Sequence, residues 1–167
     1  MEGDMGIIHR TGNVVDALLN GEVDFIAHCC NAQGVMGSGV AKETRQRIPE
    51  AYTEYLFRYN LSKQFDNGKG FLGSVNLADG VFNLIGQEYY GYDKKRYVNY
   101  GALASCFRML PCAIEQSSDK YSDECTIGIP YKMASDRAGG DWNIVLELIE
   151  HLVVPYVKDV VVYRLGE

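Results

Sequence analysis

The feature that most constrains the fold of this chain is the order in which apolar strand-like runs alternate with helix-like segments. Strand-like runs occupy 24–29, 126–129 and 159–163, and a glycine-containing loop and then a helix-like segment follow each of the first two. The run 159–163 (DVVVY) is rich in β-branched residues, which is typical of a strand buried on both faces. Strands that alternate with helices predict an α/β fold built as a three-layer α/β/α sandwich.

The other elements follow from capping and turn signals. A short strand is expected at 7–9, and Ala78-Asp79-Gly80 predicts a hairpin between strands 73–77 and 81–85, so the sheet should be mixed. Asn13 and Asp141 are expected to cap the helices that follow them, and Ile48-Pro49 should end a helix. The expected helices are 13–19, 40–47, 50–59, 100–114 and 142–152.

Length and charge set the class of protein. A chain of 167 residues predicts one domain, 1–167, with an apolar core. Sixteen basic against 22 acidic residues give a net charge of −6, which argues against broad nucleic-acid binding but not against a nucleotide ligand. Neither a membrane span nor a signal peptide is apparent, so we expect a cytoplasmic monomer without membrane partners.

The cysteines and histidines predict no metal site. The five cysteines lack the C-x-x-C spacing of zinc and redox sites, and we expect reduced, mostly buried thiols. Adjacent Cys29 and Cys30 should point to opposite faces of a strand. His28 is expected in the core and His151 on the outer face of the last helix, whereas His9 lies where it could reach a cleft. We expect neither a metal nor a cofactor.

Two loops between a strand and a helix are candidate ligand sites. The first, 31–39, contains glycines at 34, 37 and 39, whose backbone N–H groups could approach a phosphate. Its spacing fits neither a P-loop nor a dinucleotide fingerprint, and a simple tight turn is the alternative. The second, 130–141, contains Asp136 and Arg137. Asp136 could act as a general base, or it could simply form a turn.

Three stretches of sequence, in this order and spacing, resemble the signatures of macro domains. They are HCCNAQGVMGSGVA (28–41), NLIGQ (83–87) followed by YGAL (100–103), and GGDW (139–142). The similarity covers the chain from about residue 8 to residue 165. It is strongest to the branch with ADP-ribose 1″-phosphate phosphatases and terminal ADP-ribose glycohydrolases, and to small macro proteins encoded by phages.

The resemblance implies a mixed six-stranded sheet with helices on both faces and a cleft for ADP-ribose at one end. It places Asn31 beside the distal ribose of that ligand. It also implies that the loop around the diphosphate and this ribose consists of Gly37, Ser38, Gly39 and Val40. No cofactor is implied, and the partner is a small molecule or an ADP-ribosylated protein.

The resemblance assigns further residues to the cleft. Asn13 stands where the family usually has an Asp that faces the adenine, and its side-chain carbonyl could accept a hydrogen bond from the adenine amine. Tyr163 is placed either to stack on the adenine or to form part of the rim. The second loop is more polar than in the family, and its expected ligand-binding residues are Ser135, Arg137, Ala138 and Gly139.

The chemistry expected of the cleft depends on two positions. Allowing a one-residue gap, Asp136 corresponds to the catalytic Asp of the glycohydrolase branch. That branch has a nucleophilic Lys just after the middle strand, where this chain has Gln87 and Glu88. We therefore expect hydrolysis of ADP-ribose 1″-phosphate, with Asp136 and Asn31 as the catalytic residues. Removal of ADP-ribose from protein carboxylates, and binding without chemistry, are the alternatives.

Overall fold

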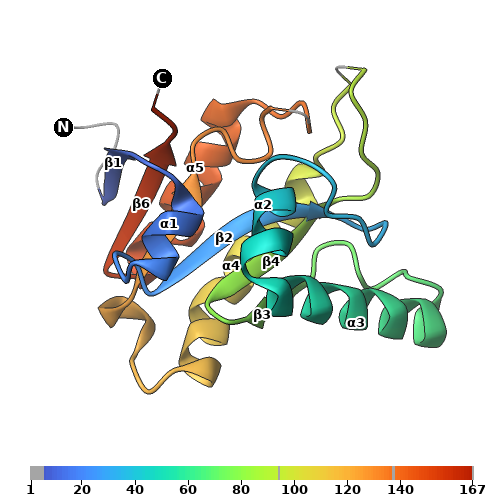
Figure 1. Cartoon of the computed structure of the whole chain (residues 1–167), viewed down its shortest axis with the longest axis horizontal. Coiled ribbons are helices and arrows are strands. Elements are labelled where there is room, and N and C mark those ends of the chain that lie inside the picture. Colours follow the sequence, from blue (N-terminus) through green and yellow to red (C-terminus); the bar gives the residue numbers. More distant parts are fainter. Residues whose placement is uncertain (1–5, 94, 137, 167) are drawn as a thin grey trace.

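A computed structural model describes residues 6–93, 95–136 and 138–166. Its centre is a six-stranded sheet in the order β1-β6-β5-β2-β4-β3 (Figure 1). All neighbouring strands are parallel except β3, which lies antiparallel to β4 at one edge, so the prediction of a mixed sheet is confirmed. The strands are β1 (Ile7–Thr11), β2 (Phe25–Asn31), β3 (Val75–Ala78), β4 (Val81–Gln87), β5 (Thr126–Pro130) and β6 (Asp159–Arg164).

Helices cover both faces of the sheet, which confirms the expected three layers. Two helices share the larger core cluster with one face, and the other three pack on the opposite face (Figure 1). The first pair is α4 (Tyr100–Ser117) and α5 (Trp142–Leu152), and the second group is α1 (Val14–Leu19), α2 (Gly39–Arg47) and α3 (Pro49–Asp66). Two 3₁₀ turns, Ser122–Glu124 and Val154–Tyr156, complete the described elements. Within the described part of the chain, we find no helix with the length and apolarity that a membrane crossing requires.

Local sequence signals explain most of the boundaries. Asn13 and Asp141 each accept backbone N–H groups in the first turn of the following helix, as expected of caps. Asp79 and Gly80 both have positive φ, which is the turn that a two-residue hairpin favours. The helix expected at 50–59 runs from Pro49 to Asp66, seven residues further at its carboxyl end, because the first stop signal comes only at Asn67, which adopts the left-handed conformation.

The parallel strands determine where a ligand can bind. Because five strands run in the same direction, their carboxyl ends meet at one edge of the sheet, where ligands of open α/β sheets bind. On β2, Cys29 packs against the core of the α4 face and Cys30 against the core of the α3 face, as predicted for adjacent strand residues. Side chains of β2 therefore reach both sides of any pocket at this edge.

Candidate functional site

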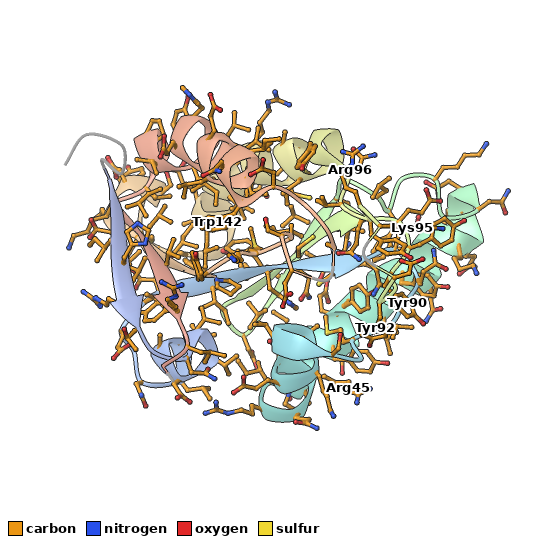
Figure 2. All side chains as sticks on the ribbon, turned by 90° about the horizontal axis from the view of Figure 1, so that it is seen from above. Arg45, Tyr90, Tyr92, Lys95, Arg96 and Trp142 are labelled. Carbon is orange, nitrogen blue, oxygen red and sulfur yellow. The ribbon has the colours of Figure 1, made fainter. Side chains whose placement is uncertain are left out.

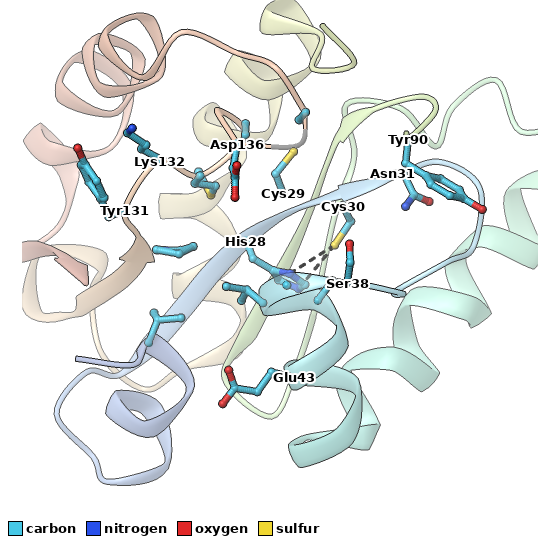
Figure 3. A pocket seen from close by; sticks show the side chains of 18 of the residues that line it. His28, Cys29, Cys30, Asn31, Ser38, Glu43, Tyr90, Tyr131, Lys132 and Asp136 are labelled. Carbon is cyan, nitrogen blue, oxygen red and sulfur yellow. Dashed lines mark hydrogen bonds between the residues drawn. The ribbon is translucent and has the colours of Figure 1, made fainter. Parts of the chain in front are cut away.

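One large pocket occupies the carboxyl edge of the sheet. Its volume is about 730 Å³, which is within the usual range for a small-molecule site. Each of the five parallel strands contributes a lining residue at or just after its end, namely Gly12, Asn31, Gln87, Pro130 and Arg164. Both loops that the sequence singled out face this pocket, since Ser38 and Asp136 line it from different loops (Figure 3).

A buried tyrosine holds the first loop in shape. The hydroxyl of Tyr55 on α3 donates to the backbone carbonyl of Asn31 at 2.6 Å and accepts from the N–H groups of Gly34 and Val35 at 3.0 and 3.1 Å. Burial is the main cause that raises the pKa of this hydroxyl far above its ordinary value. The hydroxyl therefore stays protonated and fixes the turn that carries Asn31 into the pocket.

Replacing Tyr55 with Phe tests this anchor. We expect Tyr55→Phe to lower the free energy of unfolding by about 1–3 kcal/mol, because buried backbone groups lose their hydrogen-bond partner. The measurement is urea unfolding followed by circular dichroism. Tyr52→Phe, one turn earlier on α3, is the control and should stay within about 0.5 kcal/mol of wild type. Equal stability of the two variants would contradict the anchoring role.

The Asn31 side chain is largely engaged in its own loop. Its Oδ1 accepts from the N–H of Gln33 at 2.9 Å and lies 2.9 Å from the Tyr55 hydroxyl oxygen, and its Nδ2 donates to the carbonyl of Val35 at 2.8 Å. An amide nitrogen has two hydrogens, so one donor remains on Asn31 for a ligand. Asn31 can therefore offer a positioned N–H to a hydroxyl group in the pocket.

The amino terminus of α2 forms the pocket wall next to this loop. Ser38 precedes the helix without capping it through its side chain, and Gly39, Val40 and Ala41 all line the pocket. The first N–H groups of a helix have no partner within the helix, and the helix dipole favours a negative charge there. This end of a nine-residue helix is therefore suited to an anion such as a phosphate.

The second loop brings a carboxylate to the opposite wall. It leaves β5 through Lys132 and Ala134, both with positive φ, and Gly139 sits where a Cβ would collide with the backbone of Lys95 and Arg96. Asp136 is exposed at the tip of this loop and lines the pocket. Figure 3 shows its carboxylate pointing into the pocket from the side opposite Ser38.

Neither His28 nor Cys29 offers an alternative base near neutral pH. His28 is 2% exposed, and its ring Nε2 lies 2.6 Å from Oδ1 of Asn83. Burial lowers the pKa of His28 to about 4, although the Asn83 contact opposes the shift. Burial also raises the pKa of the Cys29 thiol to about 12. The ring is therefore uncharged and a weak base, and the thiol is protonated. Asp136 is the remaining candidate base at this end of the pocket.

A network of charged side chains closes the other end of the pocket. Oδ1 of Asn13 accepts the N–H groups of Val15 and Asp16 at 2.8 and 3.0 Å, so both of its lone-pair directions are used within α1. Nδ2 of Asn13 donates to both carboxylate oxygens of Glu43 at 3.0 Å. Glu43 also pairs with Arg47 at 2.8 Å. The acceptor that a ligand amine would meet here is thus the Glu43 carboxylate.

Aromatic and cationic groups also lie at the ends of β5 and β6. Tyr163 is 4% exposed, with its hydroxyl 3.3 Å from a carboxylate oxygen of Glu22, so most of its ring is packed beneath the pocket. Tyr131 is more open, and the guanidinium of Arg164 lies 4.4 Å from the centre of its ring. Both Tyr131 and Arg164 line the pocket, together with Lys132. They provide an apolar face and positive charge for a ligand.

The structure brings together nine of the expected site residues and separates two. Ser135 and Gly139 lie outside the lining, since Ser135 bonds to the carbonyl of Met133 and Gly139 packs under Lys95. Arg137 lies outside the described residues. The nine that line the pocket are Asn13, Asn31, Gly37, Ser38, Gly39, Val40, Asp136, Ala138 and Tyr163.

Several lining residues were not predicted from the sequence. Tyr131, Lys132 and Arg164 directly follow or end parallel strands, and that position alone could have marked them as candidates. Glu43 carries no such signal, because only the packing of α1 beside α2 brings it to Asn13. Among the described residues, no three His, Cys, Asp or Glu side chains come together as they would around a metal ion.

Solved structures similar to this one include several macrodomains and a protein without a stated function. A protein of unknown function from Bacteroides thetaiotaomicron is 23% identical with a TM-score of 0.71, over 95% of this chain and 97% of that one. A macrodomain protein from Streptomyces coelicolor is 23% identical with a TM-score of 0.66, over 94% and 97% of the two chains.

A third structure holds a ligand. Thermosipho africanus DarTG, solved in complex with ADP-ribose, is 13% identical with a TM-score of 0.69, and the match covers 96% of this chain and 42% of that one. No protein-family model and no curated protein matches the sequence. The likeness in structure, together with the mixed six-stranded sheet, shows that this chain has the macrodomain fold.

Proposed function

We propose that this protein binds ADP-ribose and hydrolyses ADP-ribose 1″-phosphate to ADP-ribose and phosphate. The observation that carries the proposal is that one pocket has a helix amino terminus on one wall and the Asp136 carboxylate on the other. The presence of ADP-ribose in a structure with the same fold supports the choice of ligand. The resemblance of the loops to the phosphatase branch supports the choice of reaction.

In the proposed binding mode each part of the ligand meets a suitable group. The diphosphate lies against the N–H groups that begin α2, where negative charge is favoured. The amine of the adenine donates to Glu43, because the carbonyl of Asn13 is already used. The free N–H of Asn31 holds a hydroxyl of the distal ribose, which brings the 1″-phosphate toward Asp136.

In the proposed reaction a water molecule attacks the phosphorus of the 1″-phosphate. Asp136 orients this water and accepts its proton, the bond between phosphorus and the 1″ oxygen breaks, and that oxygen takes up a proton to give ADP-ribose. The N–H groups of Gly37 and Ser38 stabilise the charge on the phosphoryl oxygens, since those of residues 32–35 already have partners. A covalent sugar–lysine route is not part of the proposal, because Gln87 and Glu88 follow the middle strand in place of a lysine.

Phosphate release from ADP-ribose 1″-phosphate tests the proposal. The purified protein should release phosphate with saturation kinetics, and an Asp136→Ala variant measured in parallel gives the background. Wild-type turnover no greater than this background would overturn the hydrolase, and calorimetry with ADP-ribose would then decide whether a binding function remains. Retained label on an ADP-ribosylated acidic peptide would argue against protein carboxylates as the substrate.

A further inference from the structure

A loop at the pocket mouth has a composition unlike the rest of the chain. We call residues 88–97 the arch; Lys94 within it lies outside the described residues. The arch contains three of the chain's 12 tyrosines within four positions, Tyr89, Tyr90 and Tyr92. It also contains the only three consecutive basic residues in the sequence, 94–96. The overall charge of −6 therefore hides a local concentration of cations beside aromatic rings.

The arch joins the two loops that form the pocket. At its start, the carbonyl of Glu88 accepts the backbone N–H of Ala32 at 3.2 Å and the side-chain amide of Gln33 at 2.9 Å, both in the first loop. At its end, the N–H of Tyr97 donates to the carbonyl of Ala138 in the second loop at 2.7 Å. The arch is thus held at both ends against the walls of the pocket.

Three tyrosines and one lysine of the arch are exposed to solvent. The exposed fractions are 59% for Tyr89, 49% for Tyr90 and 68% for Tyr92, and the Lys95 side chain is 75% exposed. Tyr90 and Tyr92 also line the pocket. Figure 2 shows Tyr90, Tyr92 and Lys95 at the end of the molecule toward which β2 points. A ligand leaving the pocket beside Asn31 would pass these rings.

Other charges of the arch are partly neutralised. The carboxylate of Asp93 accepts the Tyr97 hydroxyl at 2.6 Å and lies 3.7 Å from the ammonium of Lys95. The guanidinium of Arg96 lies 4.9 Å from the ring centre of Tyr100. This weakens attraction to an acidic partner that uses charge alone. The exposed rings of Tyr89, Tyr90 and Tyr92 are therefore the larger part of the surface that the arch presents to a partner.

We infer that the arch binds single-stranded nucleic acid next to the pocket. Unpaired bases stack on exposed aromatic rings, and nearby Lys and Arg side chains attract the phosphates, so rings interleaved with cations favour a single strand. An acidic peptide would use the cations but gain little from three tyrosines. A short local surface is sufficient for this, so the inference is compatible with the acidity that argues against broad nucleic-acid binding.

Fluorescence anisotropy with a labelled ten-residue oligothymidylate tests the inference. At about 50 mM salt we expect micromolar binding that persists when ADP-ribose is present in excess, because the arch and the interior of the pocket are separate sites. Binding should weaken with rising salt. A Glu-rich decapeptide with the same label should bind at least about tenfold more weakly.

Matched variants locate the contact. The double variant Tyr89→Ser/Tyr92→Ser should weaken oligonucleotide binding at least about fivefold, the lower end of what one stacked base contributes, and Lys95→Glu should also weaken it. Tyr156→Ser and Lys158→Glu are the controls, because these exposed residues precede β6 and lie at the opposite edge of the sheet. The controls should bind like wild type.

Several results would overturn the inference. They are absence of binding, equal binding of the acidic peptide, equal losses in the control variants, unchanged binding in the double tyrosine variant, and full displacement by ADP-ribose. Calorimetry with ADP-ribose is run on the same wild-type sample. Failure to bind ADP-ribose while the oligonucleotide still binds would count against the proposed function alone, so the two failures can be told apart.

Discussion

Asp136→Asn is expected to lower kcat for ADP-ribose 1″-phosphate by about 100-fold or more while leaving the affinity for ADP-ribose within a factor of about three. The amide keeps the shape of the side chain but cannot accept the proton from water, and general-base catalysis typically contributes 10²-fold to 10⁴-fold. Binding could tighten slightly, because a carboxylate near a diphosphate is repulsive. Steady-state phosphate release and calorimetry measure the two quantities on the same preparation.

The control for this variant is Asp119→Asn. Asp119 is exposed and follows α4, before the 3₁₀ turn that leads to β5, and so it lies away from the carboxyl edge of the sheet. Its loss should change neither kcat nor affinity. Normal turnover by Asp136→Asn would show that Asp136 is a turn residue or a binding group. Gln87, which lines the pocket, would become the next residue to test, whereas His9 lies within β1 and outside the pocket lining.

Gly39→Glu is expected to weaken ADP-ribose binding at least about 100-fold, equivalent to about 2.7 kcal/mol. Gly39 begins α2 with a φ of 58° and lines the pocket, and a Cβ there would meet nothing within 4 Å. A longer side chain therefore extends into open pocket space rather than into the core. Its carboxylate would repel the diphosphate and occupy the place where the phosphate meets the helix amino terminus.

The backbone conformation of Gly39 requires its own control. Any L residue at this φ carries strain of roughly 1–2 kcal/mol, so Gly39→Ala should lose as much thermal stability as Gly39→Glu. Gly39→Ala adds only a methyl group and should bind ADP-ribose much better than the Glu variant. The assignment of this loop to the diphosphate is wrong if Gly39→Glu folds and binds within a factor of about three of wild type.

The order of elements and the helix caps could be predicted from the sequence because they depend on neighbouring residues. The strand DVVVY, the caps Asn13 and Asp141, and the hairpin turn at Asp79-Gly80 all lie where local signals placed them. The pocket position also followed, because loops after parallel strands gather at one edge. The end of α3 was misplaced the most, by seven residues, since it depended on a stop signal further along the chain, whereas the other bounds differ by three residues or fewer.

The roles of individual site residues were harder to predict because they depend on contacts between distant segments. The sequence indicated two uses for the carbonyl of Asn13, as a helix cap and as an acceptor for adenine, and the fold commits it to the cap. The spacing of three and four between Tyr52, Tyr55 and Tyr59 indicates a packing stripe on a helix, and all three pack with the core of that face. The hydroxyl of Tyr55 also anchors the first loop, and this role could not be predicted because it depends on the position of α3 against that loop.

The burial of His28 also links the stability of the fold to proton uptake. In the unfolded chain this ring has its ordinary pKa of 6.5, whereas in the folded protein the pKa is about 4. Between pH 6.5 and about pH 4 the His28 ring binds a proton in the unfolded state but not in the folded state, so acid favours unfolding. The stabilisation is complete above pH 6.5 and is lost as the pH falls to about 4, by an amount on the order of 3 kcal/mol.

This loss of stability can be measured by urea unfolding of wild type and His28→Gln between pH 7 and pH 4.5. The effect of carboxylates that titrate in both proteins cancels when the two free energies of unfolding are subtracted. We expect the wild type to lose more stability than the variant as the pH falls, and parallel curves would show that His28 is not the group responsible. His28, which lines the pocket, would then affect the stability of the fold in acid and not the reaction. A residue of the binding site would thus help to determine the pH range in which this protein stays folded.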